Sequence, residues 1–342
     1  MQDDSLPSWL PRLAVQRGPR FLQIADALQA AVADGSLKPG DRLPPQRLLA
    51  AQLDVDLTTI TRAYDEARRR HLLEGRGARG TYVAAPKVEW SSVLDLSMNT
   101  PPPPEGVDFD DMLKQGLSQV LMRADAQLLM TYHLGGGSDS DRKAAAQWLE
   151  PMFGSLDDRQ IVVCPGAQAA IAALILALTA PGDVILAEPA SYPGLRAAAA
   201  QFGRRILAVQ ADRQGMVPEM LEQACREHRP ALVYLNPTLQ NPTAITMSEG
   251  RRKQLASVAR RCQVRIVEDD PYWLLADAPP PPIAAFAPQQ VYYISTLSKC
   301  LTPGLRVAFV LMRDPHERQR FLVALRSFAL MATPVTAALA TQ

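Results

Sequence analysis

A lysine in a turn of small hydroxyl residues is the side chain of this sequence best suited to covalent chemistry. The turn is Ser295-Thr296-Leu297-Ser298-Lys299; it follows the apolar run Val291–Ile294, and Pro303-Gly304 then leads to Arg306. An amine that is partly removed from water loses proton affinity and becomes a nucleophile toward carbonyl carbons. The hydroxyl and guanidinium groups around it are suited to holding a phosphate. The pattern predicts a Schiff-base lysine beside a phosphate site, although a lone Ser-Lys pair usually belongs to a surface loop.

Four upstream stretches supply other parts of one cofactor site. Cys164–Ala170 turns into an apolar helix, whose free N–H groups and positive dipole end can hold a phosphate. Glu188–Gly194 presents Tyr192 in a turn, suited to stacking on a flat heterocycle. Asn236–Thr243 follows an apolar strand and offers amide donors, and Val264–Tyr272 is a strand that ends in acids and a phenol. An acid there can stay ionised against a pyridinium nitrogen and keep that ring an electron sink.

These motifs, in this order, resemble the fold type I aminotransferases that use pyridoxal 5′-phosphate, over residues 95–342. The resemblance implies that Lys299 forms the Schiff base and that Asp269 is the partner of the pyridine nitrogen. It implies a shared hydrogen-bonding role for Tyr272 and Asn241 at the phenolic oxygen, and a stacking role for Tyr192. The remaining matches concern the phosphate. The resemblance implies a phosphate cup formed by Ala167, Gln168, Thr296 and Arg306, and it implies that Tyr132 reaches the phosphate bound by the neighbouring subunit.

The first 84 residues are interpreted as a separate unit. Apolar residues recur at helical spacing in 21–32, a second helix is predicted from about Gln46 to Leu53, and a third from about Leu57 to Arg70 with Asp56 as its N-cap. Leu72–Val83 alternates around glycines like a small hairpin. Three helices and a glycine-rich wing predict a winged helix-turn-helix.

Three segments of this unit resemble the GntR family of regulators: Leu37–Ala50, Thr58–Tyr64 and Gly77–Val83. They match the entrance to helix 2, the recognition helix and the wing of that family. An arginine can contact a phosphate or a guanine edge, and a threonine can bond a phosphate or touch a thymine methyl. The residues that the match turns toward DNA are Arg47, Thr58, Thr59, Thr61, Arg62 and Arg79.

The charge of the predicted DNA-binding region is modest. Leu57–Val83 holds six arginines against three acids, a balance of +3, which is a small electrostatic footprint for DNA. Leu57 also departs from the family, where an arginine is common, and cannot make a bidentate base contact. We therefore do not expect the family's usual operator. Arg68-Arg69-Arg70 is equally well interpreted as a solvated helix end that the helix dipole favours.

A GntR-like winged helix joined to an aminotransferase-like domain is the arrangement of the MocR subfamily of bacterial regulators, and this chain is similar to its members. The resemblance implies a homodimeric transcription factor that binds operator DNA. We hypothesise that its pyridoxal phosphate domain senses the cofactor, an amine or amino acid effector, or both, through exchange of the Schiff base at Lys299. The alternative is an active aminotransferase that carries a DNA-binding appendage. A repressor whose site is purely structural is disfavoured by the complete phosphate cup.

The expected domain order follows from these matches. Residues 1–84 are the winged helix, and residues 85–106 are a linker that contains the stiff run Pro101–Pro104. Within this linker, Leu94–Asn99 is alternatively interpreted as an arm over the mouth of the cofactor pocket. Residues 107–314 are predicted to form an α/β domain with a mostly parallel sheet and helices on both faces. Residues 315–342 are expected to begin a long helix toward a small C-terminal domain that this chain lacks. In the aminotransferases that domain brings an arginine for the substrate carboxylate.

Composition narrows the setting. The chain has 342 residues, a formal charge of +1 and four cysteines without a Cys-x-x-Cys pair, which favours a reduced cytoplasmic compartment. Met1–Asp4 carries acids, so no signal peptide is expected, and no metal site is predicted. Ile161–Ala180 is uncharged and long enough to span a bilayer, but Pro165-Gly166 leaves a helix of about thirteen residues, too short to cross.

Overall fold

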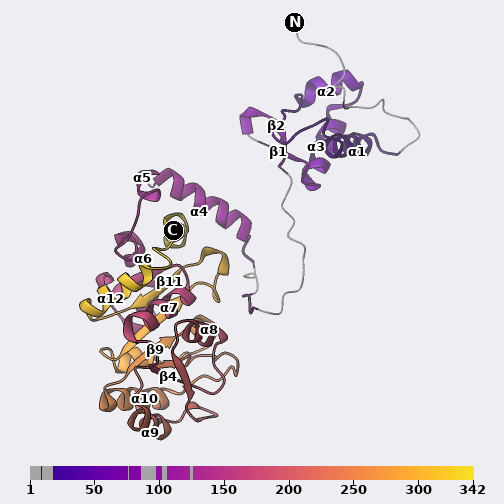
Figure 1. Cartoon of the computed structure of the whole chain (residues 1–342). Coiled ribbons are helices and arrows are strands. Elements are labelled where there is room, and N and C mark those ends of the chain that lie inside the picture. Colours follow the sequence, from indigo (N-terminus) through magenta and orange to yellow (C-terminus); the bar gives the residue numbers. More distant parts are fainter. Residues whose placement is uncertain (1–8, 10–17, 76, 86–97, 102–105, 124–125) are drawn as a thin grey trace. The chain divides into compact units, whose positions relative to one another are not determined.

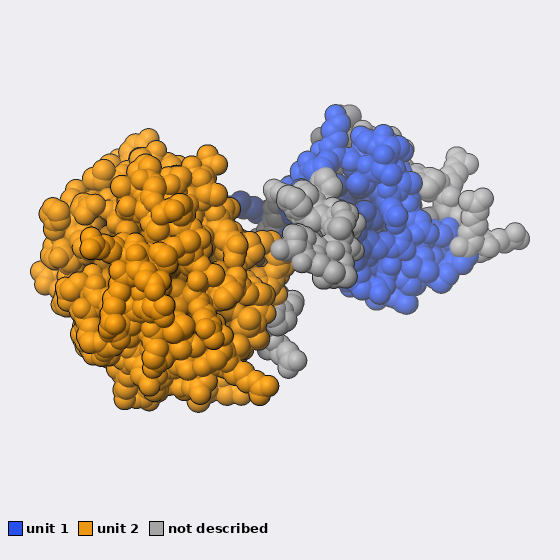
Figure 2. Space-filling model, turned by 60° about the horizontal axis from the view of Figure 1, so that its bottom comes forward, with its two compact units in different colours: residues 1–95 blue, residues 96–342 orange. Residues whose placement is uncertain are grey.

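The computed structural model places the helices and strands in two units, residues 1–95 and 96–342, each with its own core (Figures 1 and 2). It describes residues 9, 18–75, 77–85, 98–101, 106–123 and 126–342. The expectation about Met1–Asp4 and most of the predicted linker therefore lie outside the described residues. The two units are treated separately below.

The first unit packs three helices around one core. The helices are α1 (Arg20–Ala33), α2 (Gln46–Leu53) and α3 (Leu57–Arg69). Each turns apolar side chains inward at helical spacing, and Leu28, Leu49 and Tyr64 are fully buried. The three predicted helices are confirmed to within about one residue at each end, which is within the usual uncertainty of helix boundaries.

The predicted wing is present. β1 (Leu73–Gly75) pairs antiparallel with β2 (Thr81–Val83), and a 3-10 turn, Gly77–Arg79, connects them. The segment before α2 also bonds to β2, because Leu43 donates its N–H to the Thr81 carbonyl at 2.9 Å. This third partner of the hairpin was not predicted.

The second unit is built on one seven-stranded sheet (Figure 1). Its strand order is β3 (Ile161–Cys164), β11 (Ala308–Leu311), β10 (Val291–Thr296), β9 (Arg265–Asp269), β8 (Leu232–Leu235), β4 (Val184–Ala187) and β5 (Arg205–Ala208). Every neighbouring pair is parallel except the two pairs that β11 makes. The predicted mostly parallel α/β sheet is confirmed.

Helices cover both faces of this sheet. One face packs against α7 (Ala167–Leu178), α8 (Pro193–Gln201) and α12 (Pro315–Arg326). The other packs against α6 (Asp139–Phe153), α9 (Pro218–His228), α10 (Glu249–Cys262), α11 (Ile283–Phe286) and α13 (Pro334–Thr341). Outside these layers the chain adds α4 (Phe109–Arg123), α5 (Ala126–Leu129) and the ribbon β6 (Ala211–Asp212) with β7 (Gly215–Met216).

The predicted long helix from Pro315 is wrong. α12 ends at Arg326, and α13 begins only at Pro334. Leu330, in the connection between them, has a φ of 60°, which is left-handed, so one right-handed helix cannot run through it. Pro334 disfavours helical geometry at Thr333 and suits the first position of a new helix.

The uncharged stretch 161–180 divides as predicted into β3 and α7, and most of α7 is buried inside the unit. Within the described part of the chain, no helix combines the length and the apolar character needed to cross a membrane.

Candidate functional site

A pocket lies where the sheet strands β8, β9 and β10 end and α7 begins. The carboxyl ends of parallel strands are the usual place for a ligand in such a sheet. Nine of the ten predicted cofactor residues line it: Ala167, Gln168, Tyr192, Asn241, Asp269, Tyr272, Thr296, Lys299 and Arg306. It encloses about 620 Å³, counted with the solvent at its open side.

The phosphate end of the pocket depends on close approach between a glycine and an arginine. Gly166 caps α7 with a φ of 93°, and a Cβ built there would lie 2.6 Å from Nη2 of Arg306. Only glycine therefore lets this guanidinium reach the start of α7. The hydroxyl of Thr296 lies at the same end and donates to the Val307 carbonyl at 3.1 Å. Helix N–H groups, a hydroxyl and a guanidinium together suit a phosphate.

Asp269 is a buried carboxylate with one acceptor atom unused. Tyr234 donates its hydroxyl to Oδ2 at 2.6 Å, and the Asn236 side chain donates to the Asp269 carbonyl at 2.8 Å. Oδ1 is buried and has no hydrogen-bond partner among the described residues. Burial raises the pKa of Asp269 to about 6, with help from Asp270 and against the Tyr234 hydrogen bond. A protonated ring nitrogen would satisfy Oδ1 and keep the carboxylate ionised.

Lys299 and Tyr272 are joined by one residue of the arm. Lys299 donates from Nζ to the Asn99 carbonyl at 2.6 Å, while the Asn99 side chain donates to the Tyr272 hydroxyl at 2.7 Å. Burial lowers the pKa of Lys299, and the nearby Arg306 lowers it further. Burial raises the pKa of Tyr272, while hydrogen bonds with Asn99 and Asn241 oppose this effect. The lysine is thus biased toward its neutral, nucleophilic form.

Tyr192 and Gln168 line the same pocket. Tyr192 is the residue before α8, and Pro193 occupies the first helical position. Gln168 donates from Nε2 to the Gly194 carbonyl at 2.9 Å. A Cβ at Gly194 would lie 2.2 Å from Oε1 of Gln168, so a glycine is needed for this contact. The turn predicted to present an aromatic side chain does so in the structure.

The sequence interpretation missed a buried ionic cluster behind β9. Side chains alternate along a strand, so Asp269 lies on one face and Glu268 and Asp270 on the other. Arg252 of α10 is fully buried, 3.9 Å from the Glu268 carboxylate, and donates to Thr238 Oγ1 at 3.0 Å. Burial raises the pKa of Glu268 to about 7 and that of Asp270 to about 6. The signal in the sequence that could have indicated this cluster is the run of three acids at the end of the strand, Glu268-Asp269-Asp270.

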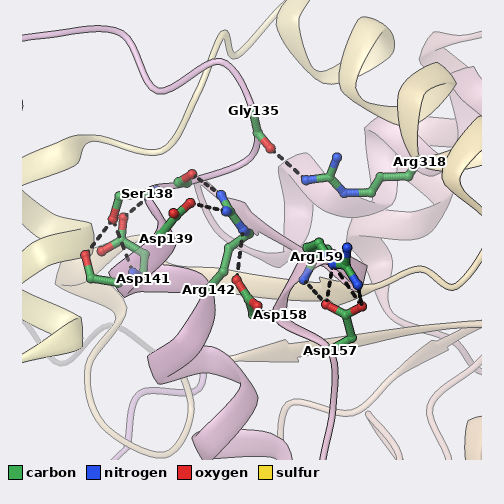
Figure 3. Close-up of polar contacts among 11 residues, drawn as sticks. Gly135, Ser138, Asp139, Asp141, Arg142, Asp157, Asp158, Arg159 and Arg318 are labelled. Atoms are coloured by element: carbon green, nitrogen blue, oxygen red, sulfur yellow. Dashed lines mark hydrogen bonds and ion pairs between the residues drawn. The ribbon is translucent and has the colours of Figure 1, made fainter.

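Tyr132 does not line this pocket. Its side chain is 72% exposed, and the loop that follows it is held by arginines. Arg142 donates to the Gly137 carbonyl at 2.7 Å and Arg318 to the Gly135 carbonyl at 2.8 Å; Figure 3 shows both reaching the loop, from α6 and α12. Arg326 adds a bond to Leu134 at 3.0 Å. The role of Tyr132 at a neighbouring subunit stays a prediction.

Some of the predicted DNA-facing residues are exposed, and others contact neighbouring groups of the same unit. Arg47, Thr58 and Arg79 are exposed on α2, at the start of α3 and in the wing. The Thr61 hydroxyl instead lies 3.0 Å from both the Gln46 side chain and the Leu57 carbonyl. Arg62 is exposed, and its guanidinium carbon lies 4.2 Å from the centre of the Phe21 ring. Thr59, next to Thr58, is half-buried.

The arginine run at the end of α3, Arg68–Arg70, is paired within the unit. Arg68 contacts Asp65 at 2.7 Å, and Arg70 contacts Asp26 of α1 at 2.6 Å. Arg69 contacts Glu66. These ion pairs favour the interpretation of the run as a solvated helix end over its interpretation as a DNA contact. Asp56 precedes α3 as predicted, but its side chain makes no capping hydrogen bond.

Comparisons with known proteins agree with both units. A family described as aminotransferase class I and II matches residues 91–342, and bacterial regulatory proteins of the gntR family match residues 21–83. The chain is 31% identical to the uncharacterized HTH-type transcriptional regulator YdeF of Bacillus subtilis, over 97% of this chain and 73% of that protein. It is 30% identical to the vitamin B6 salvage pathway transcriptional repressor PtsJ of Salmonella typhimurium, over 84% of this chain and 66% of that protein.

Solved structures give the same picture for the second unit. The multiple substrate aminotransferase from Thermococcus profundus superposes with a TM-score of 0.65 at 29% identity. The match covers 74% of this chain and 64% of that enzyme, so this chain spans less than two thirds of its length. The winged helix, the sheet and the two family matches point to one conclusion. This chain belongs to the MocR subfamily of GntR-type transcriptional regulators, in which a gntR-family segment precedes a class I and II aminotransferase domain.

Proposed function

We propose that this protein is a DNA-binding transcriptional regulator that binds pyridoxal 5′-phosphate in the pocket around Lys299 and responds there to the cofactor, to an amine or amino acid, or to both. The family arrangement supports this proposal, and so does the similarity to PtsJ, whose name assigns it to the vitamin B6 salvage pathway. Because the proposed partner is chromosomal DNA, we place the protein in the cytoplasm.

The unpaired Oδ1 of Asp269 carries the cofactor assignment. A buried acceptor without a donor costs free energy, on the order of 1–3 kcal/mol, unless a ligand supplies the donor. The protonated ring nitrogen of pyridoxal phosphate is such a donor. The other lining residues then fit the rest of the molecule, because the start of α7, Thr296 and Arg306 suit its phosphate and Tyr192 suits its ring.

Each side chain of the pocket has a separate task in this proposal. Asp269 would hold the ring nitrogen, and Tyr272 with Asn241 would hold the phenolic oxygen. Lys299 would present its amine to the aldehyde, since burial and Arg306 lower its pKa. When bound, the cofactor supplies an electrophilic carbon that amines can attack and an electron-withdrawing ring.

The exposed residues of the winged helix would contact DNA. Arg47 and Arg79 present guanidinium groups, which bind phosphates or guanine edges, and Thr58 can bond a phosphate. We further propose a homodimer, in which Tyr132 reaches the phosphate of the neighbouring subunit. The regulator acts only if the cofactor or effector binds the two DNA-affinity states differently.

The second candidate function is transamination. Lys299 with its lowered pKa is also suited to moving protons at a substrate carbon, and the fold is that of active aminotransferases. Turnover of an amino donor with a 2-oxo acid at about one per second or faster would favour this function.

A visible-absorption titration with DNA binding measured on the same samples tests the proposal. The purified chain is loaded with pyridoxal phosphate and titrated with a panel of amines and amino acids, using a duplex that it selects from a random-sequence pool. A compound that changes both the cofactor spectrum and the DNA affinity supports the regulator. A spectrum that changes with turnover while DNA affinity stays constant supports the enzyme.

A further inference from the structure

One large apolar side chain of the winged helix is exposed to solvent. Leu57 is the first residue of α3, and its exposed fraction is 42%. Among the described residues of this unit, every other large apolar side chain is buried or half-buried. A single exposed leucine on a protein surface is ordinary. What Leu57 can do therefore depends on where α3 presents it.

The start of α3 is the end of a helix-turn-helix that faces DNA bases. α3 follows α2 after only three residues, Asp54–Asp56, which is the short connection typical of this motif. The opposite side of α3 includes Ile60 and Tyr64, which pack in the core of the unit. In this motif the second helix enters the major groove, and residues at its N-terminus contact base edges. Leu57 and Thr58 are the two exposed residues of this first turn.

The nearest polar side chain on the same side of α3 is already bonded within the unit. Thr61 follows Leu57 by four residues, which places the two side chains next to each other along the helix. The Thr61 hydroxyl lies 3.0 Å from the Gln46 side chain and 3.0 Å from the Leu57 carbonyl. On this side of the first turn, base recognition therefore depends on Leu57.

The chemistry of leucine restricts what it can recognise on a base edge. Its side chain has no hydrogen-bond donor or acceptor with which to pair a polar group of a base. Placing it against such a group would remove that group from water without a partner, which costs free energy. The C5-methyl group of thymine is the apolar group that base edges present in the major groove. Leu57 is therefore suited to contact a thymine.

We propose that Leu57 is a specificity-determining residue of this regulator. It packs against the methyl group of a thymine in the major groove and so selects a T·A pair at that position of the operator. This inference rests on the proposed function, because it requires the winged helix to bind DNA sequence-selectively. Burying one methyl-sized group corresponds to about a fourfold change in Kd.

The test removes the methyl group from the DNA and the side chain from the protein. The full chain first selects duplexes from a random-sequence pool. Each thymine of one selected half-site is then replaced in turn by deoxyuridine, which lacks only the methyl group and keeps the same hydrogen-bonding edge. The Kd of every duplex is measured for wild type, Leu57→Ala and Leu274→Ala. Leu274 is the matched control, because it is a leucine of the second unit that is 45% exposed.

We expect one thymine at which replacement by deoxyuridine weakens binding about fourfold, both in wild type and in Leu274→Ala. In Leu57→Ala, the same replacement should change the Kd by less than about 1.5-fold, because the methyl group has lost its apolar partner. The comparison is a ratio of two Kd values within each protein. A general loss of DNA affinity in Leu57→Ala therefore cancels and cannot imitate the expected result.

A Leu57→Arg variant gives a second, independent readout. An arginine can bind the O6 and N7 atoms of a guanine with two hydrogen bonds, whereas it gains nothing from a thymine methyl group. When the selection from the random-sequence pool is repeated with this variant, guanine should replace thymine at the position identified with deoxyuridine. Selection of the same thymine by Leu57→Arg would contradict the inference.

The outcomes separate this inference from the function on which it rests. If wild type selects a sequence but no thymine has a methyl effect that depends on Leu57, the inference is overturned and the proposed function stands. If wild type selects no sequence from the pool, sequence-selective DNA binding fails, and the role of Leu57 fails with it.

Discussion

The winged helix and the pocket place their candidate functional residues in opposite environments. Arg47 and Arg79 are exposed on a small helical unit, whereas Asp269 and its neighbours on β9 are buried in a large one. Exposed charges keep their ordinary chemistry and are screened by salt. Buried ones are altered by burial itself, as the raised pKa of Asp269 shows.

This difference decides what each region can do. Around the winged helix, several arginines are neutralised by acids of the same unit, so DNA affinity depends on the few that are left exposed. In the pocket unit, burial lowers the pKa of Lys299 and raises that of Asp269 inside the pocket, and it also raises the pKa values of Glu268 and Asp270 behind β9. We therefore expect substitutions in the pocket unit to have large effects on binding or stability, and those on the DNA face to have moderate effects on affinity alone.

The largest effect is expected from Lys299→Ala. Without the amine, the absorption band of the Schiff base between pyridoxal phosphate and the protein should disappear, because the covalent link is lost. Lys253→Ala is the matched control, since Lys253 is an exposed lysine paired with Glu249 on α10. A Schiff-base band that persists in Lys299→Ala would show that the cofactor site has been misassigned.

Arg252→Met sharpens the contrast between buried and exposed charge. Removing this fully buried guanidinium leaves Glu268 and Asp270 without their cation and should lower the free energy of unfolding by about 3–5 kcal/mol. Arg261→Met on the same helix removes an exposed pair with Glu222 and should cost under about 1 kcal/mol. Urea denaturation measures the free energy of unfolding of both variants. Equal losses in the two variants would contradict the difference expected between a buried and an exposed ion pair.

Asp270→Asn tests the burial through pH. The pKa of Asp270 is raised from 3.8 to about 6 by burial, against Arg252 and the Thr238 and Tyr293 hydrogen bonds. Its stabilising contribution is therefore complete below about pH 4 and is lost as pH rises through 6. Between pH 4 and 7, the free energy of unfolding should change in favour of the variant by about 2 kcal/mol.

The control for this pH experiment is an exposed acid. The pKa of Asp157 is lowered to about 2 by Arg159, so Asp157→Asn should show no such change between pH 4 and 7. A flat difference for Asp270→Asn would mean that the cluster is more hydrated than its burial suggests.

The smallest effects are expected on the DNA face. Arg47→Ala and Arg79→Ala should each weaken binding to the selected duplex about tenfold and reduce the salt slope by about one. Arg68→Ala should change the affinity less than about twofold, because Arg68 is paired with Asp65. Salt titrations of DNA binding measure all three, and an equal loss in Arg68→Ala would remove the distinction between exposed and paired arginines.

The sequence by itself determined the elements and their order. Helical spacing in 21–32, the glycines around the wing and the apolar runs that became β4, β8 and β9 are local patterns, which are visible without knowledge of tertiary contacts. The motif residues of the pocket could be named for the same reason. The helix from Pro315 was wrong because the apolar pattern did not reveal the break between Arg326 and Pro334, in which Leu330 is left-handed.

Only the tertiary structure decided which groups meet and what state they are in. The bonds from Asn99 to Lys299 and Tyr272 join residues far apart in sequence, and no local pattern specifies them. In the sequence, nothing distinguishes Arg252 from the charged residues on either side of it, and only the fold buries it beside Glu268. Contacts and pKa values depend on burial and on distant neighbours, and both exist only after the chain has folded.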